Sequence, residues 1–133
     1  MPKNGNSLIK KGGVSMRASR AEIKIEEILE KAGLVFKMEY IFPGLNSPGG
    51  KPLRFDFVIF DDDGNIDFII EYQGKQHYEA SQKFGGKRGL YQQQFNDNQK
   101  RRFCALHDFN LIEIPYTEEN LISYDYIMKR AGY

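Results

Sequence analysis

The chain has 133 residues, enough for one domain with a buried core but too few for two. Hydrophobic residues make up 41% and aromatic residues 14%, a composition that excludes an intrinsically disordered chain. The net charge of +1 says nothing about an acidic partner, and no apolar run approaches the roughly 20 residues that span a bilayer. The single cysteine, Cys104, excludes an internal disulfide and suits a reducing cytosol.

Charge is unevenly distributed along the chain. Residues 1–18 are rich in Gly, Ser, Asn and Lys, which predicts a flexible basic arm ahead of a single domain of residues 19–133. Residues 83–102 carry six basic residues against the single Asp97. The acidic residues gather at 22–30, 56–71 and 113–125. Basic segments around an acidic centre suit an anionic polymer held near bound cations, but solvated surfaces explain them equally well.

A first helix is predicted at residues 20–32. Ser19 and Glu22 form a capping box, S-x-x-E, in which each side chain accepts a hydrogen bond from the other residue's backbone N–H. An apolar stripe with helical spacing follows, formed by Ile25, Ile28, Leu29 and Ala32. Gly33 suits the position after the helix because glycine readily adopts the left-handed conformation found there.

Three strands are predicted next. The run 34–42 places Phe36, Met38, Tyr40 and Phe42 on one face and is expected to stop at Pro43. A loop rich in proline and glycine, 43–52, then leads into two further strands at about 53–60 and 66–73.

The remainder of the chain predicts helix, strand and helix. The first helix covers about 88–107, the strand 110–114, and the last helix 118–130 with Thr117 as its cap. The expected buried side of the first of these helices is formed by Tyr91, Phe95, Phe103 and Leu106. The fold class is therefore α/β, with a mixed central sheet flanked by helices and an extra helix at the C-terminus.

The two central strands are joined by an Asp-Gly pair that favours a two-residue hairpin turn. With 63–64 as the turn, Phe60 faces Asp67 and Asp56 faces Glu71. Directly opposed residues have Cβ atoms about 5 Å apart on the same face of the sheet, so the two carboxylates are expected to be neighbours.

Opposed carboxylates repel each other unless a positive charge lies between them. Carboxylate oxygens converging in an apolar setting suit Mg²⁺ or Mn²⁺, which would activate water and offset the charge of a phosphate. The alternative is a structural salt bridge, since the same register places Arg54 opposite Gln73, next to Asp56 and Glu71.

The predicted order α-β-β-β-α-β and the acids on its second and third strands resemble the PD-(D/E)xK nuclease superfamily. More narrowly, the chain resembles small phage and bacterial endonucleases related to the very-short-patch-repair nuclease. The segments that carry the resemblance are Ser19–Glu22, Arg54–Phe57, Ile70–Tyr78, Phe84–Gly86 and Leu111–Tyr116. They cover roughly residues 19–116 and imply a restriction-endonuclease-like αβββαβ core.

The resemblance implies that Asp56 and Glu71 hold Mg²⁺, with Mn²⁺ as a substitute, and that the main-chain carbonyl of Tyr72 adds a ligand. Gln73 stands where many relatives carry the lysine of the motif, a departure that some restriction enzymes share. Lys75, two residues further on, would lie on the same face if the strand continues. It is therefore a candidate to replace that lysine in activating water.

Further candidate site residues each have a functional and a structural explanation. The resemblance places His77 near the metal as a general acid/base or phosphate contact, whereas a histidine at a strand end can simply bond a backbone carbonyl. Glu22 either only caps its helix or also points toward the metal. Gln94, Asp97 and Lys100 could reach a phosphate or the edge of the site, although a solvated helix face is favoured.

The sequence thus predicts a divalent-metal-dependent DNA endonuclease in the bacterial or phage-infected host cytosol, of a nicking, homing or repair type. It would bind double-stranded or branched DNA and no membrane. The residues expected to contact the DNA backbone are Arg20, Arg54, Lys87, Arg88, Lys100 and Arg101. A resolving enzyme for branched DNA, which would require a homodimer, an RNA-directed nuclease and a non-catalytic nucleic-acid-binding module stay open as alternatives.

Overall fold

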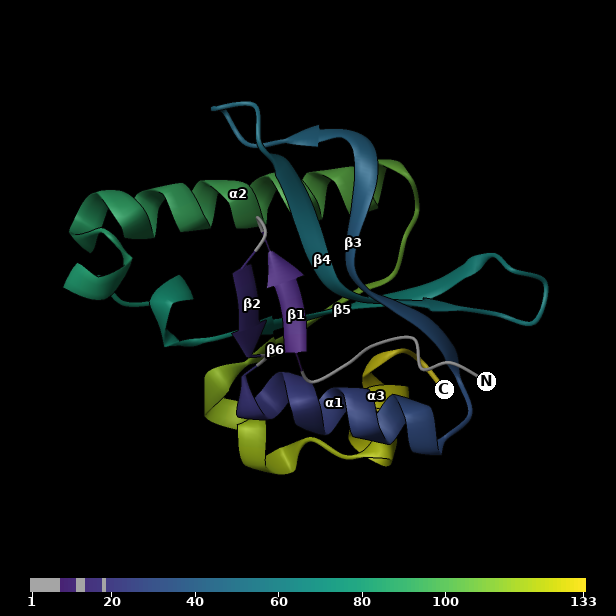
Figure 1. Ribbon diagram of the computed structural model, residues 1–133. Helices are drawn as coiled ribbons and strands as arrows, with labels where there is room; N and C mark the ends of the chain where they lie inside the picture. Colours follow the sequence, from purple (N-terminus) through teal and green to yellow (C-terminus); the bar gives the residue numbers. More distant parts are fainter. Residues whose placement is uncertain (1–7, 12–13, 18) are drawn as a thin grey trace.

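The computed structural model describes residues 8–11, 14–17 and 19–133, and side chains from residue 19 onward. The predicted α/β class is confirmed, because a four-stranded mixed sheet is flanked by helices (Figure 1). Its strands are β3 (Val35–Asn46), β4 (Pro52–Phe60), β5 (Ile66–Gln73) and β6 (Leu111–Pro115), in that spatial order. The first two pairings are antiparallel and the β5–β6 pairing is parallel.

Helices lie on both faces of the sheet, so the described domain has three layers (Figure 1). One face packs against α1 (Arg20–Lys31) and α3 (Tyr124–Arg130), and the other packs against α2 (Gly86–Leu106). Three short 3₁₀ helices complete the described elements: η1 (Lys75–His77), η2 (Gln82–Phe84) and η3 (Tyr116–Leu121). The predicted capping box at the start of α1 is present, with both of its hydrogen bonds formed.

The predicted N-terminal arm contains a short antiparallel hairpin, β1 (Leu8–Lys11) and β2 (Val14–Arg17). Figure 1 draws this hairpin in front of the sheet. The rest of the arm, residues 1–7, 12–13 and 18, lies outside the described residues. The flexibility of the arm and the division at residue 18 therefore stay predictions.

The two sheet faces bury separate cores. The core beside α1 and α3 includes Ile25, Leu29, Phe57, Phe68, Ile70 and Ile127. The core beside α2 includes Leu53, Phe55, Val58, Ile69 and Cys104. Because β5 is buried on both faces, its burial alternates only weakly with position, and four consecutive residues from Phe68 to Glu71 are buried.

The single apolar face predicted for the first strand is wrong. Met38 packs against the core beside α1, whereas Tyr40 packs against the core beside α2. Between them Glu39 has a φ of 52°, a left-handed conformation that few residues other than glycine adopt. A left-handed residue interrupts the alternation of a strand, as in a β-bulge, and sends the following side chains to the other face.

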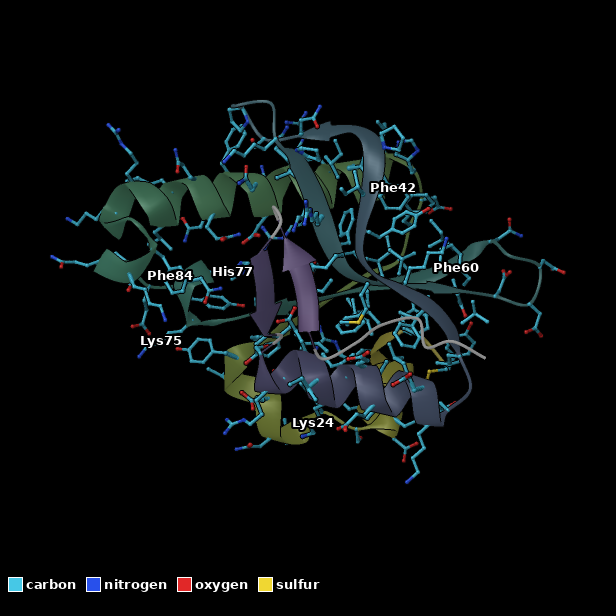
Figure 2. The ribbon with its side chains drawn as sticks, viewed as in Figure 1. Lys24, Phe42, Phe60, Lys75, His77 and Phe84 are labelled. Carbon is cyan, nitrogen blue, oxygen red and sulfur yellow. The ribbon has the colours of Figure 1, made fainter. Side chains whose placement is uncertain are left out.

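The first strand is also longer than predicted. Proline does not stop it at position 43, because β3 continues to Asn46 and the connecting loop shrinks to residues 47–51. An edge strand tolerates proline since one of its sides needs no backbone donor. The outer part of β3 curls over the C-terminal half of α2, where the Phe42 ring lies 5.1 Å from that of Phe103 (Figures 1 and 2).

The predicted last helix, 118–130, is divided in two. The first part is the 3₁₀ helix η3, and α3 begins only at Tyr124. The cap of α3 is Ser123, whose hydroxyl accepts a hydrogen bond from Tyr126 N, rather than Thr117. Extended backbone at Ile122, which is buried in the core, separates the two parts.

The predicted buried side of α2 is wrong. Tyr91, Phe95 and Leu106 are 66%, 49% and 84% exposed, and of the predicted four only Phe103 packs against the core. The helix instead turns a largely polar stripe toward the sheet, formed by Gln93, Asp97, Lys100 and Cys104. Polar side chains can be buried there because partners on β5 and η1 satisfy them.

Candidate functional site

Asp56 and Glu71 lie beside each other on β4 and β5, as the sequence predicts. They directly follow the last backbone pair, Phe57 with Ile70, and each carboxylate bonds the backbone of the opposite strand. Asp56 N donates to Glu71 Oε2 at 2.7 Å, and Tyr72 N donates to Asp56 Oδ2 at 2.8 Å. These two bonds fix the orientation of both side chains where the strand pairing ends.

The turn that sets this register differs from the predicted one. It has three residues between Asp61 and Asn65, whose backbones bond at 2.8 Å, and its glycine has a φ of 83°. Phe60 therefore pairs with Ile66 rather than with Asp67. Asp67 is an extra, unpaired residue in β5, and it restores the predicted register from the next pair onward.

A cluster of three acids gathers around Asp56. The pairs Met38–Phe57 and Tyr40–Phe55 place Glu39 of β3 opposite Asp56. Glu22, in the first turn of α1, approaches from the helix. One carboxylate oxygen from each of Glu22, Glu39 and Asp56 lies within 4.8 Å of the others, and we call these three residues the acid cluster.

The capping and site roles considered for Glu22 are compatible in this geometry. Glu22 Oε1 accepts a hydrogen bond from Ser19 N at 3.0 Å, and Glu22 N donates to Ser19 Oγ at 3.2 Å. The cap therefore anchors the side chain while its carboxylate stands beside Asp56. Glutamine also completes a capping box, so the charge of Glu22 can be removed without removing the cap.

Sequence reasoning missed Glu39. Its signal was a lone charge within the apolar run of the first strand, but its role depends on the β3–β4 register. No short turn fixes that register, because the loop 47–51 and an irregularity beyond Ile41 separate the two strands. The left-handed φ of Glu39 is a second signal, and only the structure reveals it.

Burial makes the charge of Asp56 costly. Burial in the sheet raises the pKa of the Asp56 carboxyl well above its ordinary value, and the nearby carboxylates of Glu71 and Glu22 raise it further. A divalent cation would reverse this effect by compensating the clustered negative charge. Three converging carboxylates are hard oxygen donors, so the residues present fit Mg²⁺ or Mn²⁺.

Glu71 is not part of the acid cluster, and its second oxygen is paired with a lysine. Lys100 Nζ donates to Glu71 Oε1 at 2.7 Å, and the two side chains are 12% and 6% exposed. The alternative of a salt bridge to Arg54 is therefore replaced by one to Lys100. The solvated position favoured for Lys100 is wrong, and the predicted ligand role of Glu71 stays a prediction.

The Glu71–Lys100 pair balances burial against charge. Burial raises the pKa of Glu71, and the Lys100 ammonium opposes that rise. Burial alone would lower the pKa of Lys100, but the surrounding carboxylates, Glu71 foremost, together outweigh it, so the pKa of Lys100 is raised. Lys100 therefore remains an ammonium beside the acids, with further attraction from Asp56 and Asp97.

His77 forms a buried pair with Asp97. Its Nδ1 lies 2.8 Å from Asp97 Oδ2, and the two side chains are 10% and 5% exposed. Gln93 Nε2 donates to the other carboxylate oxygen of Asp97 at 3.2 Å. Figure 2 places His77 beneath the N-terminal half of α2. The alternative of a backbone carbonyl partner for His77, and the solvated position favoured for Asp97, are both wrong.

A pocket of about 220 Å³ lies beside this pair. Its lining residues are Gln73, His77, Tyr78, Gln94, Asp97 and Arg101. Gln73 is buried and links three elements, because its amide bonds Glu113 of β6 and accepts from Tyr78 Oη at 2.6 Å. Arg101 binds Glu113 in turn at 2.8 Å, so Gln73 and Arg101 are held by structural contacts.

Lys75 does not meet the condition under which it was a candidate. The strand ends at Gln73, and Lys75 opens η1 instead of continuing the face of β5. Its side chain is 67% exposed and lies 3.7 Å from Glu79. The lysine that does reach the acids comes from α2. The Tyr72 carbonyl stays a predicted ligand.

The cations predicted to contact DNA fall into two groups. Arg20, Lys100 and Arg101 are already paired, with Glu119, Glu71 and Glu113 respectively. In the part of the chain that the structure describes, Arg54, Lys87 and Arg88 make no ion pair. Lys87 and Arg88 are exposed at the start of α2, and their contact with DNA stays a prediction.

Comparison with known proteins finds viral relatives. The chain is similar to the uncharacterized protein 094L of Frog virus 3 (isolate Goorha), at 44% identity over 60% of this chain and 50% of that protein. It is also similar to the uncharacterized protein 307L of Invertebrate iridescent virus 6, at 39% identity over 63% of this chain and 44% of that protein. A third relative is the uncharacterized protein 033L of Invertebrate iridescent virus 3, at 31% identity over 80% of this chain and 54% of that protein. The chain spans about half the length of these curated relatives.

The names of these relatives state no activity. No family model matches the chain, and no solved structure matches it. Within the described residues, none of the helices combines the length and the apolar character needed to cross a membrane.

Proposed function

We propose that this chain is a divalent-metal-dependent endonuclease that hydrolyses phosphodiester bonds of DNA. The observation that carries the proposal is the convergence of Glu22, Glu39 and Asp56 within 4.8 Å, beside the buried Glu71–Lys100 pair. The resemblance to the PD-(D/E)xK superfamily supports the same reaction, and the αβββαβ order of the fold is compatible with it.

The acid cluster would hold Mg²⁺ or Mn²⁺. Such an ion would supply Lewis acidity, polarising a phosphate oxygen and lowering the pKa of a water molecule. Glu71 has a supporting part in this proposal, because its Oε2 holds the backbone of Asp56 and its Oε1 holds Lys100. A direct ligand role for Glu71 and for the Tyr72 carbonyl remains part of the proposal to be tested.

Lys100 is the candidate for the role that the missing motif lysine leaves open. The side-chain amide of Gln73 is hydrogen-bonded to Glu113 and Tyr78, whereas the Lys100 ammonium lies beside the acids. An ammonium in this position can donate to a phosphate oxygen or orient an attacking water. The structural pattern favours a lysine supplied by α2 over one supplied by β5.

His77 is the candidate proton carrier. Asp97 holds Nδ1, which leaves Nε2 as the nitrogen available for proton exchange with water or a leaving oxygen. Gln93 holds Asp97 in turn, so the imidazole orientation is fixed by two successive side chains. The neighbouring pocket of about 220 Å³ gives this pair space for a ligand group.

The test is a cleavage assay with supercoiled plasmid and with linear, nicked, mismatched and four-way-junction DNA, in Mg²⁺ or Mn²⁺. We expect the wild type to cut and Asp56→Asn to be inactive. Asp62→Asn is the matched control, since it removes an exposed turn carboxylate outside the acid cluster. An inactive wild type favours the non-catalytic binding module, and cleavage that survives Asp56→Asn overturns the assigned site. RNA of matched sequence tests the RNA-directed alternative.

A further inference from the structure

A second pocket lies at the outer face of α2, where the loop between β3 and β4 approaches the helix. Its volume is about 550 Å³. The lining residues are Ser47, Pro48, Gly49 and Lys51 from the loop and Arg88, Tyr91, Gln92, Phe95 and Asn96 from α2. We propose that this pocket binds an unpaired nucleobase of single-stranded nucleic acid.

Two exposed aromatic rings favour a planar ligand. Tyr91 and Phe95 are one helical turn apart on α2 and are 66% and 49% exposed. Aromatic side chains beside a groove provide faces on which bases stack, and such stacking tolerates any base sequence. The exposure of these rings, which contradicts the buried role expected for them, thus has a functional explanation.

A buried polar atom favours a ligand with a hydrogen-bond donor. Asn96 Oδ1 has no hydrogen-bond partner, and it is the sole buried side-chain N or O atom of the described residues in that condition. An acceptor withdrawn from water without a partner is unfavourable. Asn96 lines the pocket, so a ligand donor would satisfy Oδ1 once the Asn96 side chain turns toward the ligand. Every nucleobase carries an amino or imino N–H that can donate in this way.

The charge of the pocket favours a polyanion. Lys51 and Arg88 are exposed, make no ion pair within the described ranges, and have no acidic residue beside them in the lining. Two unpaired cations flanking aromatic faces suit the phosphates on either side of a bound base. An acidic peptide would use the cations but would offer no planar base for the two rings.

The inference rests on the proposed function for its class of ligand and adds a separate binding site. Asp97 and Lys100 face the sheet and its acids, whereas Tyr91 and Phe95 face outward from the same helix. A single strand that leaves a nick or branch could therefore be held on α2 while the duplex lies at the acid cluster. Unpaired DNA is accordingly the substrate feature that this pocket would select.

The experiment measures binding of a dye-labelled single-stranded oligonucleotide by fluorescence anisotropy in EDTA, so that cleavage does not contribute. A second probe has the same length of sugar-phosphate without bases. We expect the wild type to bind the probe with bases about tenfold more tightly. The double variant Tyr91→Ala/Phe95→Ala should lose that preference, whereas Leu106→Ala, which removes an exposed apolar side chain outside the pocket, should keep it.

Two further measurements separate the contribution of the Asn96 side chain to binding from that of the two cations. Asn96→Leu should weaken binding without destabilising the fold, because it removes an unsatisfied polar atom. Lys51→Ala/Arg88→Ala should weaken both probes and reduce the slope of affinity against salt by about one for each cation. Equal affinity of the wild type for the two probes overturns the proposal, as does displacement of the oligonucleotide by polyglutamate at equal charge concentration.

The result of the binding experiment in EDTA does not depend on whether the protein cleaves DNA. Base-selective binding in EDTA by a protein that never cuts DNA would support this pocket and reject the proposed nuclease. Cleavage without base-selective binding would do the reverse.

Discussion

Glu39 lies opposite Asp56 across the β3–β4 pairing, and their carboxylates approach within 4.8 Å. The arrangement is costly twice over: Glu39 has a left-handed φ of 52°, and burial with neighbouring acids raises the pKa of Asp56. Strained backbone and unfavourable charge persist where the surrounding structure enforces them, and they are typical of functional sites. A bound cation would turn the same arrangement into a favourable one.

Removing the charge of Glu39 should abolish stabilisation by metal. We expect saturating Mg²⁺ or Mn²⁺ to raise the melting temperature of the wild type, since a ligand at about one hundred times its dissociation constant contributes about 2.7 kcal/mol. Glu39→Gln should show little or no rise in differential scanning calorimetry. Glu22→Gln should behave in the same way while keeping its cap, and Asp62→Asn should respond like the wild type. An undiminished response of Glu39→Gln would exclude Glu39 as a ligand.

The stability of the metal-free protein should fall as pH rises from acid toward neutral. The folded pKa of Asp56 is raised above its unfolded value, so its contribution is fully present below the unfolded pKa and is lost as pH rises through the folded pKa. The pKa of Glu71 is also raised, so its contribution to stability likewise falls as pH rises. Asp56→Asn keeps an acceptor for Tyr72 N and removes the charge, so it should stabilise the protein by about 0.5–2 kcal/mol at neutral pH.

Urea unfolding in EDTA across that pH range measures this difference. The curves of the wild type and Asp56→Asn should converge below the ordinary carboxyl pKa of about 4, where the wild-type group is protonated in both states. A variant that is less stable than the wild type at neutral pH would show that Asp56 is not the strained group.

Much of the fold could be predicted because it depends on local signals. The capping box located the start of α1 at Arg20, and alternation with turn residues located β5 at Ile66–Gln73 without error. Features that depend on tertiary context were missed: β3 passes its proline because it is an edge strand, and Ile122 divides the last helix because it enters the core. Local propensity carries no information on either.

In the candidate site, too, residues fixed by local sequence signals could be predicted, and those that depend on tertiary contacts could not. Asp56 and Glu71 were placed together because a tight turn fixes the β4–β5 register, and the bulge at Asp67 compensates the error in turn length. Lys100 was assigned to a solvated face because hydrophobic periodicity assigns the apolar stripe of a helix to the core. In α2 this rule is reversed, since buried partners on β5 and η1 attract the polar stripe inward.

The Glu71–Lys100 pair should be strongly coupled. Lys100→Met keeps the apolar stem but leaves the buried Glu71 carboxylate without its cation, which should cost about 3 kcal/mol at neutral pH. The double variant Lys100→Met/Glu71→Gln removes both charges and keeps an acceptor for Asp56 N, so it should recover most of that loss. Lys87→Met, at an exposed lysine that makes no ion pair with a described residue, should change stability by less than about 0.5 kcal/mol.

A double-mutant cycle from chemical denaturation gives the coupling energy directly. Additive effects of Lys100→Met and Glu71→Gln would mean that the two side chains do not interact. In the cleavage assay Lys100→Met should be inactive, and the double variant should remain inactive although its stability is restored. That combination separates a role in catalysis from a role in folding.

Asp97 should act on catalysis through His77. Asp97→Asn preserves shape but can donate to Nδ1, which would favour the tautomer with the proton on Nε2 and remove the acceptor that an attacking water needs. We expect the cleavage rate to fall by roughly 10²–10⁴-fold, the range ascribed to a positioned acid–base group, with metal-induced stabilisation unchanged.

His77→Gln should lose a similar factor, and the variant Asp97→Asn/His77→Gln should lose no more than either alone, because the two residues act as a unit. Gln94→Ala, at an exposed side chain that lines the same pocket and makes no hydrogen bond to any described residue, is the control and should retain near-wild-type rates. Multiplicative losses in the double variant, or a pH–rate profile of Asp97→Asn identical to that of the wild type, would show that Asp97 does not work through the imidazole.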